Sequence, residues 1–170
     1  LITSLVDEML ELSLNENAPE AVAKDDVVEV NDLLRDILQE NEYKVNKAVK
    51  LQFESDLSED ISLQTNEGML KRVINLLLDN ANKYTKKGSI TLKASANDEQ
   101  IILTVEDTGS GIPADAAEHI FERFFKVDSF REGLGLGLPL CRTIINRLGG
   151  TVDLDNSYQQ GARFVVKINR

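Results

Sequence analysis

The stretch "DTGSGIP" (107–113) stands directly after the alternating run "QIILTVED" (100–107). Because apolar and polar side chains alternate in that run, it predicts a half-buried β-strand that ends at Asp107. A residue at this point is delivered into the opening beyond the edge of a sheet. Gly109 and Gly111 allow the backbone to turn with positive φ, or to approach a flat ligand closely. The Asp107 carboxylate is therefore a candidate acceptor for a hydrogen bond from an exocyclic amine.

A second glycine run, "EGLGLGLPL" (132–140), opens a helix that the periodicity predicts over residues 136–148. Backbone amides that are free at the start of a helix suit phosphate oxygens, and the helix dipole adds to their effect. Taken alone, either glycine run is equally compatible with an ordinary turn. The glycines of the second run are Gly133, Gly135 and Gly137.

The longest predicted helix runs from Thr65 to Thr85 and carries a third polar element. Asn80 projects from the flank of its buried stripe, with Lys83 and Tyr84 about one turn further on. An amide oxygen at that position is a candidate ligand for Mg²⁺, whose other ligands would be phosphates and water. Lys83 is a candidate to face phosphate, and a solvated polar face is the alternative for this run. The stripe consists of Leu70, Val73, Ile74, Leu77, Leu78 and Ala81.

The other periodicities mix helices and strands. Further helices are predicted over residues 31–47, with Asn31 as the N-cap, and over 114–124. Because the last two predicted strands follow one another directly, a wholly parallel sheet is not expected. The pattern predicts an α+β fold, a two-layer α/β sandwich whose mixed, mostly antiparallel sheet is covered on one face by about three helices. The predicted strands are 27–30, 49–55, 61–63, 89–96, 100–107, 151–155 and 163–168.

Composition excludes several classes of function. The formal net charge of −10 argues against nucleic acid as a partner, because such binding needs clustered Lys and Arg. No apolar run approaches the roughly 20 residues that cross a bilayer, and no signal peptide is recognised. The single cysteine, Cys141, excludes an internal disulfide framework and is expected to be a buried helix residue.

Four motifs together resemble the ATP-binding catalytic domain of sensor histidine kinases, in the GHKL group. "LLLDNANKYT" (76–85) resembles the N box, and "DTGSGIP" the first glycine box. "FERFFK" (121–126) resembles the F box, and "GLGLGLPL" (133–140) the second glycine box. The motifs occur in the family's order and at its spacing, so the resemblance implies the GHKL ATP-binding fold and the cofactors ATP and Mg²⁺.

The resemblance also implies roles for individual residues. Asp107 would take the adenine amine, Asn80 would ligate Mg²⁺, and Lys83 would act with Asn80 in catalysis. Residues 125–134 would form a lid, with Phe124 or Phe125 controlling the lid or a partner contact and Phe121 in the core. The other positions that the resemblance assigns to the nucleotide are Tyr84, Gly109, Gly111, Ile112, Gly133, Gly135, Leu136, Gly137 and Leu138.

Three positions depart from the family's pattern. Leu76 lies where the hydrolytic GHKL ATPases carry the glutamate that activates water and where the kinases usually carry a polar residue. This argues against a gyrase-, mismatch-repair- or chaperone-type ATPase. Leu134 replaces a small hydroxyl residue, which removes one phosphate contact. Pro139 is unusual in the second glycine box, although the first turn of a helix tolerates proline.

The resemblance divides the chain into three parts. Residues 1–17, whose apolar stripe is Leu5, Met9 and Leu12, would be the end of the dimerisation and phosphoacceptor hairpin. Residues 18–26 would be a linker, and residues 27–170 the catalytic domain. The only histidine, His119, lies beside the F box and is interpreted as a surface or capping residue. The substrate histidine is therefore expected upstream of Leu1.

The implied function is transfer of the ATP γ-phosphoryl to a histidine on a helical hairpin of the same or the partner subunit. The implied partners are that hairpin, a response regulator receiver domain and, in the full-length protein, a second copy of the chain. The resemblance places the domain in the cytoplasm, in a membrane-anchored sensor. Two alternatives stay open, a GHKL-type ATPase and a nucleotide-binding interaction module without chemistry.

Overall fold

Five strands form the main sheet of the computed structural model, which describes residues 2–17, 22–126 and 135–170. The strand order is β2-β4-β5-β7-β6, where β2 is Val49–Ser55, β4 is Gly88–Ala96, β5 is Gln100–Asp107, β6 is Gly150–Leu154 and β7 is Arg163–Asn169. β2 pairs with β4 in parallel, and the other three pairs are antiparallel. The predicted mixed, mostly antiparallel sheet is therefore confirmed.

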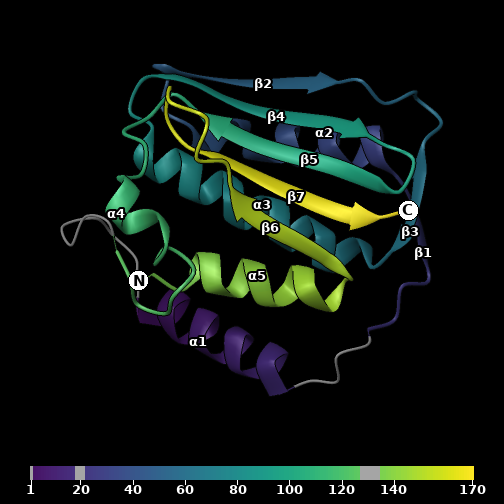
Figure 1. Cartoon of the computed structure of the whole chain (residues 1–170), viewed down its shortest axis with the longest axis horizontal. Coiled ribbons are helices and arrows are strands. Elements are labelled where there is room, and N and C mark those ends of the chain that lie inside the picture. Colours follow the sequence, from purple (N-terminus) through teal and green to yellow (C-terminus); the bar gives the residue numbers. More distant parts are fainter. Residues whose placement is uncertain (1, 18–21, 127–134) are drawn as a thin grey trace.

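Three helices cover one face of this sheet (Figure 1). They are α2 (Val30–Asn41), α3 (Glu67–Tyr84) and α5 (Gly137–Arg147). The helix α1 (Ile2–Asn17) lies below α5, on the side of the helix layer that faces away from the sheet (Figure 1). The predicted two-layer sandwich is confirmed, with α1 added outside the helix layer.

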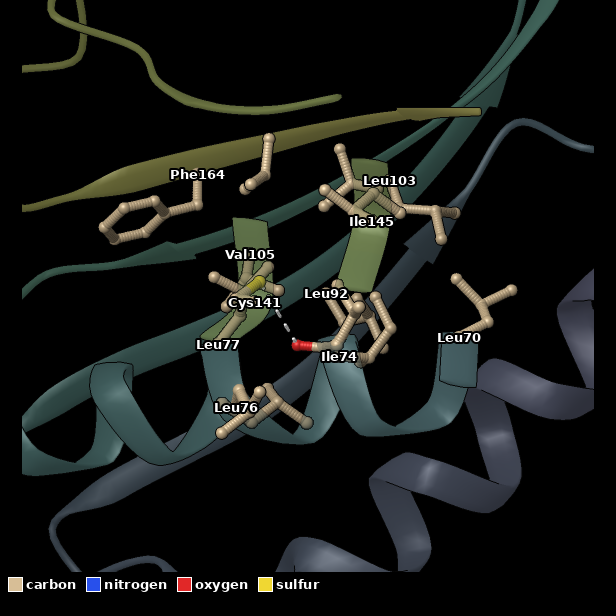
Figure 2. Close-up of a cluster of buried hydrophobic side chains, with 14 of the residues drawn as sticks. Leu70, Ile74, Leu76, Leu77, Leu92, Leu103, Val105, Cys141, Ile145 and Phe164 are labelled. Carbon is tan, nitrogen blue, oxygen red and sulfur yellow. Dashed lines mark hydrogen bonds between the residues drawn. The ribbon is translucent and has the colours of Figure 1, made fainter. Parts of the chain in front are cut away.

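The core lies between α3, α5 and the sheet (Figure 2). The predicted stripe of α3 is fully buried and faces the inward side chains of β4, β5 and β7. Cys141 of α5 lies in the same cluster, 3.9 Å from the Val73 carbonyl oxygen, and burial raises the pKa of its thiol to about 12. Cys141 is therefore a packing residue, as predicted.

A small second sheet pairs β1 (Asp26–Glu29) with β3 (Ser62–Thr65) in antiparallel register. The helix that follows β1 corrects the predicted N-cap. Its N-cap is Glu29, and Asn31 is buried inside it. The Asn31 amide donates to the Leu57 carbonyl at 3.2 Å and accepts from Ser55 Oγ at 2.6 Å. The Asn31 side chain thus satisfies a buried loop instead of a helix end.

The end of α2 also differs from the prediction. The α-helix ends at Asn41, followed by a 3₁₀ turn, η1 (Glu42–Lys44), instead of continuing to residue 47. The buried Asn41 amide donates to the Ile37 carbonyl at 2.7 Å and to Asn75 Oδ1 at 2.8 Å. These bonds tie the last turn of α2 to α3.

The helix predicted over residues 114–124 is wrong for most of its length. The helix α4 covers only Ala114–Ala117, and turns follow it as far as Phe124. Phe124 has a φ of 64°, which a bulky residue rarely adopts, and its amide donates to the Gly135 carbonyl. Phe121 packs against the core, as predicted, with the Arg142 guanidinium 3.7 Å from its ring centroid. Tertiary contacts at this segment replace the helical ones.

The helix α1 is docked against the rest of the chain and lies within the predicted segment 1–17. Leu12 is 2% exposed, whereas Met9 of the same predicted stripe is 46% exposed. Both oxygens of the Glu11 carboxylate accept from the Arg72 guanidinium at 2.9 Å. Asn15 accepts a hydrogen bond from Arg147 of α5. Among the residues that the structure describes, no helix combines the length and the apolar character that a membrane crossing requires.

Candidate functional site

One pocket gathers the predicted site residues from three motifs. It holds about 960 Å³ of empty space, part of which is open solvent, and lies between α3, the end of β5 and the start of α5. Of the residues predicted from sequence, those lining it are Asn80, Lys83, Tyr84, Asp107, Gly111, Ile112, Gly135, Leu136, Gly137 and Leu138. Gly133, Leu134 and most of the predicted lid lie outside the described residues. Phe125, at the start of that segment, lines the pocket, while Phe124 is 53% exposed.

Asp107 is the buried carboxylate of the pocket, with 3% of its surface exposed. Its Oδ1 accepts from the backbone amides of Gly109 at 2.9 Å and Ala162 at 3.3 Å. Burial raises the pKa of this carboxyl, and the two amides oppose the rise. Its carbonyl oxygen accepts from the Tyr158 hydroxyl at 3.0 Å. The residue is fixed on its backbone side and still has acceptor capacity on Oδ2.

Gly109 is required by close packing instead of by a special φ. A Cβ at this position would stand 2.2 Å from the Tyr84 carbonyl oxygen and 2.9 Å from Thr85 Oγ1. The amide of Ser110 donates to the same Tyr84 carbonyl at 3.2 Å. The absence of a side chain therefore lets the loop after β5 lie directly on the end of α3, which brings the first glycine box and the N box together.

The start of α5 forms a second part of the pocket. Its N-cap, Leu136, makes no side-chain capping bond, and Pro139 lies in the first turn, where its missing amide costs little. Gly135 has a φ of +69°, and a Cβ there would lie 2.3 Å from the Phe125 carbonyl oxygen. The first residues of this 11-residue helix, Gly137 and Leu138, line the pocket, and no side chain caps the helix start.

The N box supplies polar side chains beside this helix start. Asn80 is half-buried and lines the pocket together with Lys83, one turn further along α3. Burial raises the pKa of Glu8, and the charges of Arg72 and Lys83 oppose that rise. Leu76 is 4% exposed and also lines the pocket, 3.9 Å from where a Cβ of Gly137 would stand. The carboxylates of Asp79 and Glu8 line the pocket too, so the apolar contribution on this side is that of Leu76 alone.

No group of three or more His, Cys, Asp or Glu side chains in the described part of the chain could hold a metal ion. A metal in this pocket would therefore take most of its ligands from elsewhere. Mg²⁺ commonly does so, because it keeps several waters and binds substrate phosphates with one or two protein ligands. The Asn80 amide oxygen fits that requirement.

Four residues of the pocket were missed by sequence reasoning. Ala162 comes from the segment before β7, Ile120 from the turn after α4, Asp79 from α3 and Glu8 from α1. Ala162 carried a weak signal, since Gly161 before it marks a turn into the last strand. Glu8 carried none, because nothing in the sequence shows where α1 docks.

His119 lies on the surface, outside this pocket. Its Nδ1 is 3.0 Å from the Glu122 carboxylate, which raises the pKa of the imidazole. Its ring also lies 5.5 Å from that of Phe125. These contacts agree with the interpretation of His119 as a surface residue.

The comparison with protein families decides the classification. Residues 65–170 match the family described as histidine kinase-, DNA gyrase B- and HSP90-like ATPase. The chain belongs to this family. The matched residues include the N box and both glycine boxes, so the family assignment and the pocket rest on the same segments.

The relatives and solved structures that the chain resembles include a sensor protein and a histidine kinase. It is 38% identical over 104 residues to the sensor protein SrrB of Staphylococcus aureus, which covers 58% of this chain and 18% of SrrB. Full-length ShkA in complex with AMPPNP shares 27% identity at a TM-score of 0.86, over 98% of this chain and 35% of ShkA. The nucleotide-free catalytic domain of the histidine kinase ThkA shares 29% identity at a TM-score of 0.74, over 85% of this chain and 96% of that domain.

ThkA has also been solved in complex with the response regulator protein TrrA, at 27% identity and a TM-score of 0.78, over 99% of this chain and 47% of that one. The match between this chain and its relatives covers only part of their length, namely 18% of SrrB and 35% of ShkA. The AMPPNP and TrrA complexes are properties of ShkA and ThkA.

Proposed function

We propose that this chain is the ATP-binding catalytic domain of a sensor histidine kinase. It transfers the γ-phosphoryl of ATP to a histidine on a helical hairpin upstream, for relay to a response regulator. One observation carries this proposal. A single pocket combines a buried, backbone-anchored Asp107 with the uncapped start of α5 and with the polar residues Asn80 and Lys83.

The base of the nucleotide lies against Asp107. A carboxylate with acceptor capacity on one oxygen suits the exocyclic amine of adenine, which is a donor. Guanine would present a carbonyl oxygen at the same place, so that two hydrogen-bond acceptors would face each other without a donor. Gly111 and Ile112 form the adjoining wall of the pocket. The arrangement therefore favours adenine nucleotides over guanine nucleotides.

The phosphates lie against the start of α5. Amides of the first turn and the helix dipole favour negative charge there, and the ammonium of Lys83 adds a cation. Asn80 provides an oxygen ligand for Mg²⁺, which when bound neutralises phosphate charge. Phosphoryl transfer depends mainly on such positioning and neutralisation, so this chain needs no nucleophile of its own.

The domain organisation follows from the same proposal. Residues 1–17 form the end of the phosphoacceptor hairpin, residues 18–26 a linker and residues 27–170 the catalytic domain. In support, α1 carries three exposed apolar side chains although its Leu12 is buried, namely Met9, Leu10 and Leu14. These would pack in the dimeric hairpin of the full-length protein, in a cytoplasmic part of a membrane-anchored sensor.

The proposal predicts that ATP binding and ATP hydrolysis separate in this chain. Leu76 cannot activate water, so the chain should bind Mg·ATP in calorimetry but release phosphate slowly in a steady-state assay. Leu76→Glu is the informative variant, because it introduces a carboxylate at the position where the hydrolytic GHKL ATPases carry one. Rapid hydrolysis by the unmodified chain would favour an ATPase. Absence of any ATP binding would contradict both the kinase and the ATPase function.

A second prediction concerns pH. Only the ionised Asp107 carboxylate offers Oδ2 fully as an acceptor, so adenosine affinity should fall as pH drops through its pKa. Burial raises the pKa of Asp107, so the fall should begin at a higher pH than for an ordinary aspartate, whose pKa is about 3.9. The effect on folding has the opposite sign, because a raised pKa stabilises the fold at low pH and that contribution is lost as pH rises.

Adenosine titrations between about pH 4 and pH 7, with circular dichroism at each pH, would test this. An affinity that stays constant over this range in the folded protein would show that the base does not bind Asp107. A loss of affinity that coincides with unfolding would equally contradict the prediction.

A further inference from the structure

Thr85 carries a buried hydroxyl directly behind the candidate adenine-binding residue. It is the C-cap of α3, and 2% of its surface is exposed. Its Oγ1 has no hydrogen-bond partner among the described residues. A buried hydroxyl without a partner costs free energy, since water would have satisfied it. The fold therefore leaves this hydroxyl without a hydrogen bond of full geometry, and its nearest acceptor is the Asp107 carboxylate.

The hydroxyl lies beside Asp107. Oγ1 is 2.9 Å from the point where a Cβ of Gly109 would stand, and the Gly109 amide is bound to Asp107 Oδ1. The Thr85 hydroxyl also lies close enough to the Asp107 carboxylate to lower its pKa. A hydroxyl hydrogen rotates to suit its acceptor, so a small adjustment brings it onto the carboxylate.

The acceptor sites of the carboxylate explain why this donor would be needed. An ionised carboxylate offers about four lone-pair sites on two oxygens. Oδ1 already accepts from the amides of Gly109 and Ala162. Two sites remain on Oδ2, and the exocyclic amine of a purine base would fill one of them. The Thr85 hydroxyl is the buried donor placed to fill the other.

We propose that Thr85 is a positioning residue for the purine base, whose hydroxyl donates to the Asp107 carboxylate in the nucleotide-bound state. The bond holds Oδ2 in the orientation that accepts from the exocyclic amine. This inference rests on the proposed function, because it takes Asp107 as the residue that binds adenine.

Thr65 provides a matched control within the chain. It precedes α3 as Thr85 follows it, is 1% exposed, and its Oγ1 likewise has no partner among the described residues. The 18 residues of α3 separate the two threonines by about 27 Å. Thr65 does not line the nucleotide pocket. Thr65→Val therefore removes an equivalent buried hydroxyl without touching the site.

The experiment compares Thr85→Val, Thr85→Ser and Thr65→Val for adenosine affinity by calorimetry and for thermal unfolding. Thr85→Val should weaken adenosine, ADP and ATP binding equally, by about tenfold, because it acts on the base alone. Thr85→Ser should restore the affinity, and Thr65→Val should leave it unchanged. The melting temperature of Thr85→Val should not fall, because valine removes an unsatisfied polar atom. Thr85→Ala serves as a second hydroxyl-free variant if valine prevents folding.

The pH profile separates positioning from a structural role. The groups around the Asp107 carboxylate are the two backbone amides, the Thr85 hydroxyl and, on the Asp107 carbonyl, the Tyr158 hydroxyl. Without the Thr85 donor the pKa of Asp107 rises, so adenosine affinity should decline at a higher pH in Thr85→Val than in the wild type. Thr65→Val should keep the wild-type profile.

Two results would overturn the inference. One is wild-type adenosine affinity and an unchanged pH profile in Thr85→Val. The other is an equal loss of affinity in Thr85→Val and Thr65→Val, which would mean general loosening of α3. Failure of the wild-type chain to bind adenosine is a different result, since it would contradict the proposed function itself and this inference with it.

Discussion

Asp107→Asn is expected to weaken ATP binding by more than about a hundredfold, since hydrogen bonds to a charged acceptor contribute about 1.5–3 kcal/mol and more than one is lost. The amide keeps the size of the side chain but has only one acceptor oxygen. If that oxygen faces the amides of Gly109 and Ala162, the NH₂ group meets the adenine amine. If it is turned around, the NH₂ group meets the two backbone donors. Calorimetry with ATP and with adenosine should show equal losses.

Asp115→Asn is the matched control, because Asp115 is an exposed aspartate on α4, outside the pocket. It should bind ATP like the wild type. Unchanged ATP affinity in folded Asp107→Asn would mean that the base binds elsewhere. Circular dichroism and thermal unfolding establish that each variant is folded.

Asn80→Ala is expected to remove most of the gain in ATP affinity that Mg²⁺ gives. Loss of a partner in the outer shell of a metal already costs about tenfold to a hundredfold, and loss of a direct ligand should cost at least as much. Adenosine has no phosphate and should bind Asn80→Ala like the wild type. The measurement is the ratio of ATP affinities with and without Mg²⁺.

Asn82→Ala is the control for this variant, since Asn82 lies two residues on in α3 and donates to the Lys44 carbonyl at 3.0 Å, outside the pocket. It should keep the full effect of Mg²⁺. If Asn80→Ala weakens adenosine and ATP equally, the residue supports the fold instead of the metal, and the magnesium assignment is wrong.

The parts of the fold that the sequence predicts are those where local periodicity and tertiary burial agree. The stripe of α3 and the alternation in β5 each reflect a single buried face, so their positions follow from spacing alone. The segment 118–124 has a helical pattern but not a helix, because Arg142 and Gly135 bind it from α5 and from the chain before α5. Asn31 is predicted as an N-cap because its actual hydrogen-bond partners, Ser55 and Leu57, are distant in sequence and no local pattern indicates them.

The residues that line the pocket also divide into those that local sequence predicts and those that it does not. Asp107, Asn80 and Gly135 were predictable because each belongs to a compact motif with its own chemical logic. Ala162 was not, because its amide reaches Asp107 only through the pairing of β5 with β7, which no local pattern specifies. Glu8 reaches the pocket only through the docking of α1, which depends on distant partners such as Arg72. Thr85 ends the N box, but its burial behind Asp107 appears only when α3 and β5 are packed together.

Transfer of the γ-phosphoryl of ATP to a histidine is the reaction that the proposed function requires. The measurement is incubation of ATP radiolabelled on the γ-phosphate with this chain and with a longer protein that includes the upstream hairpin. We predict acid-labile, base-stable label on a hairpin histidine of the longer protein, and no label on the 170-residue chain alone. Label on His119, or no label on a longer protein that is folded and binds ATP, would contradict the account.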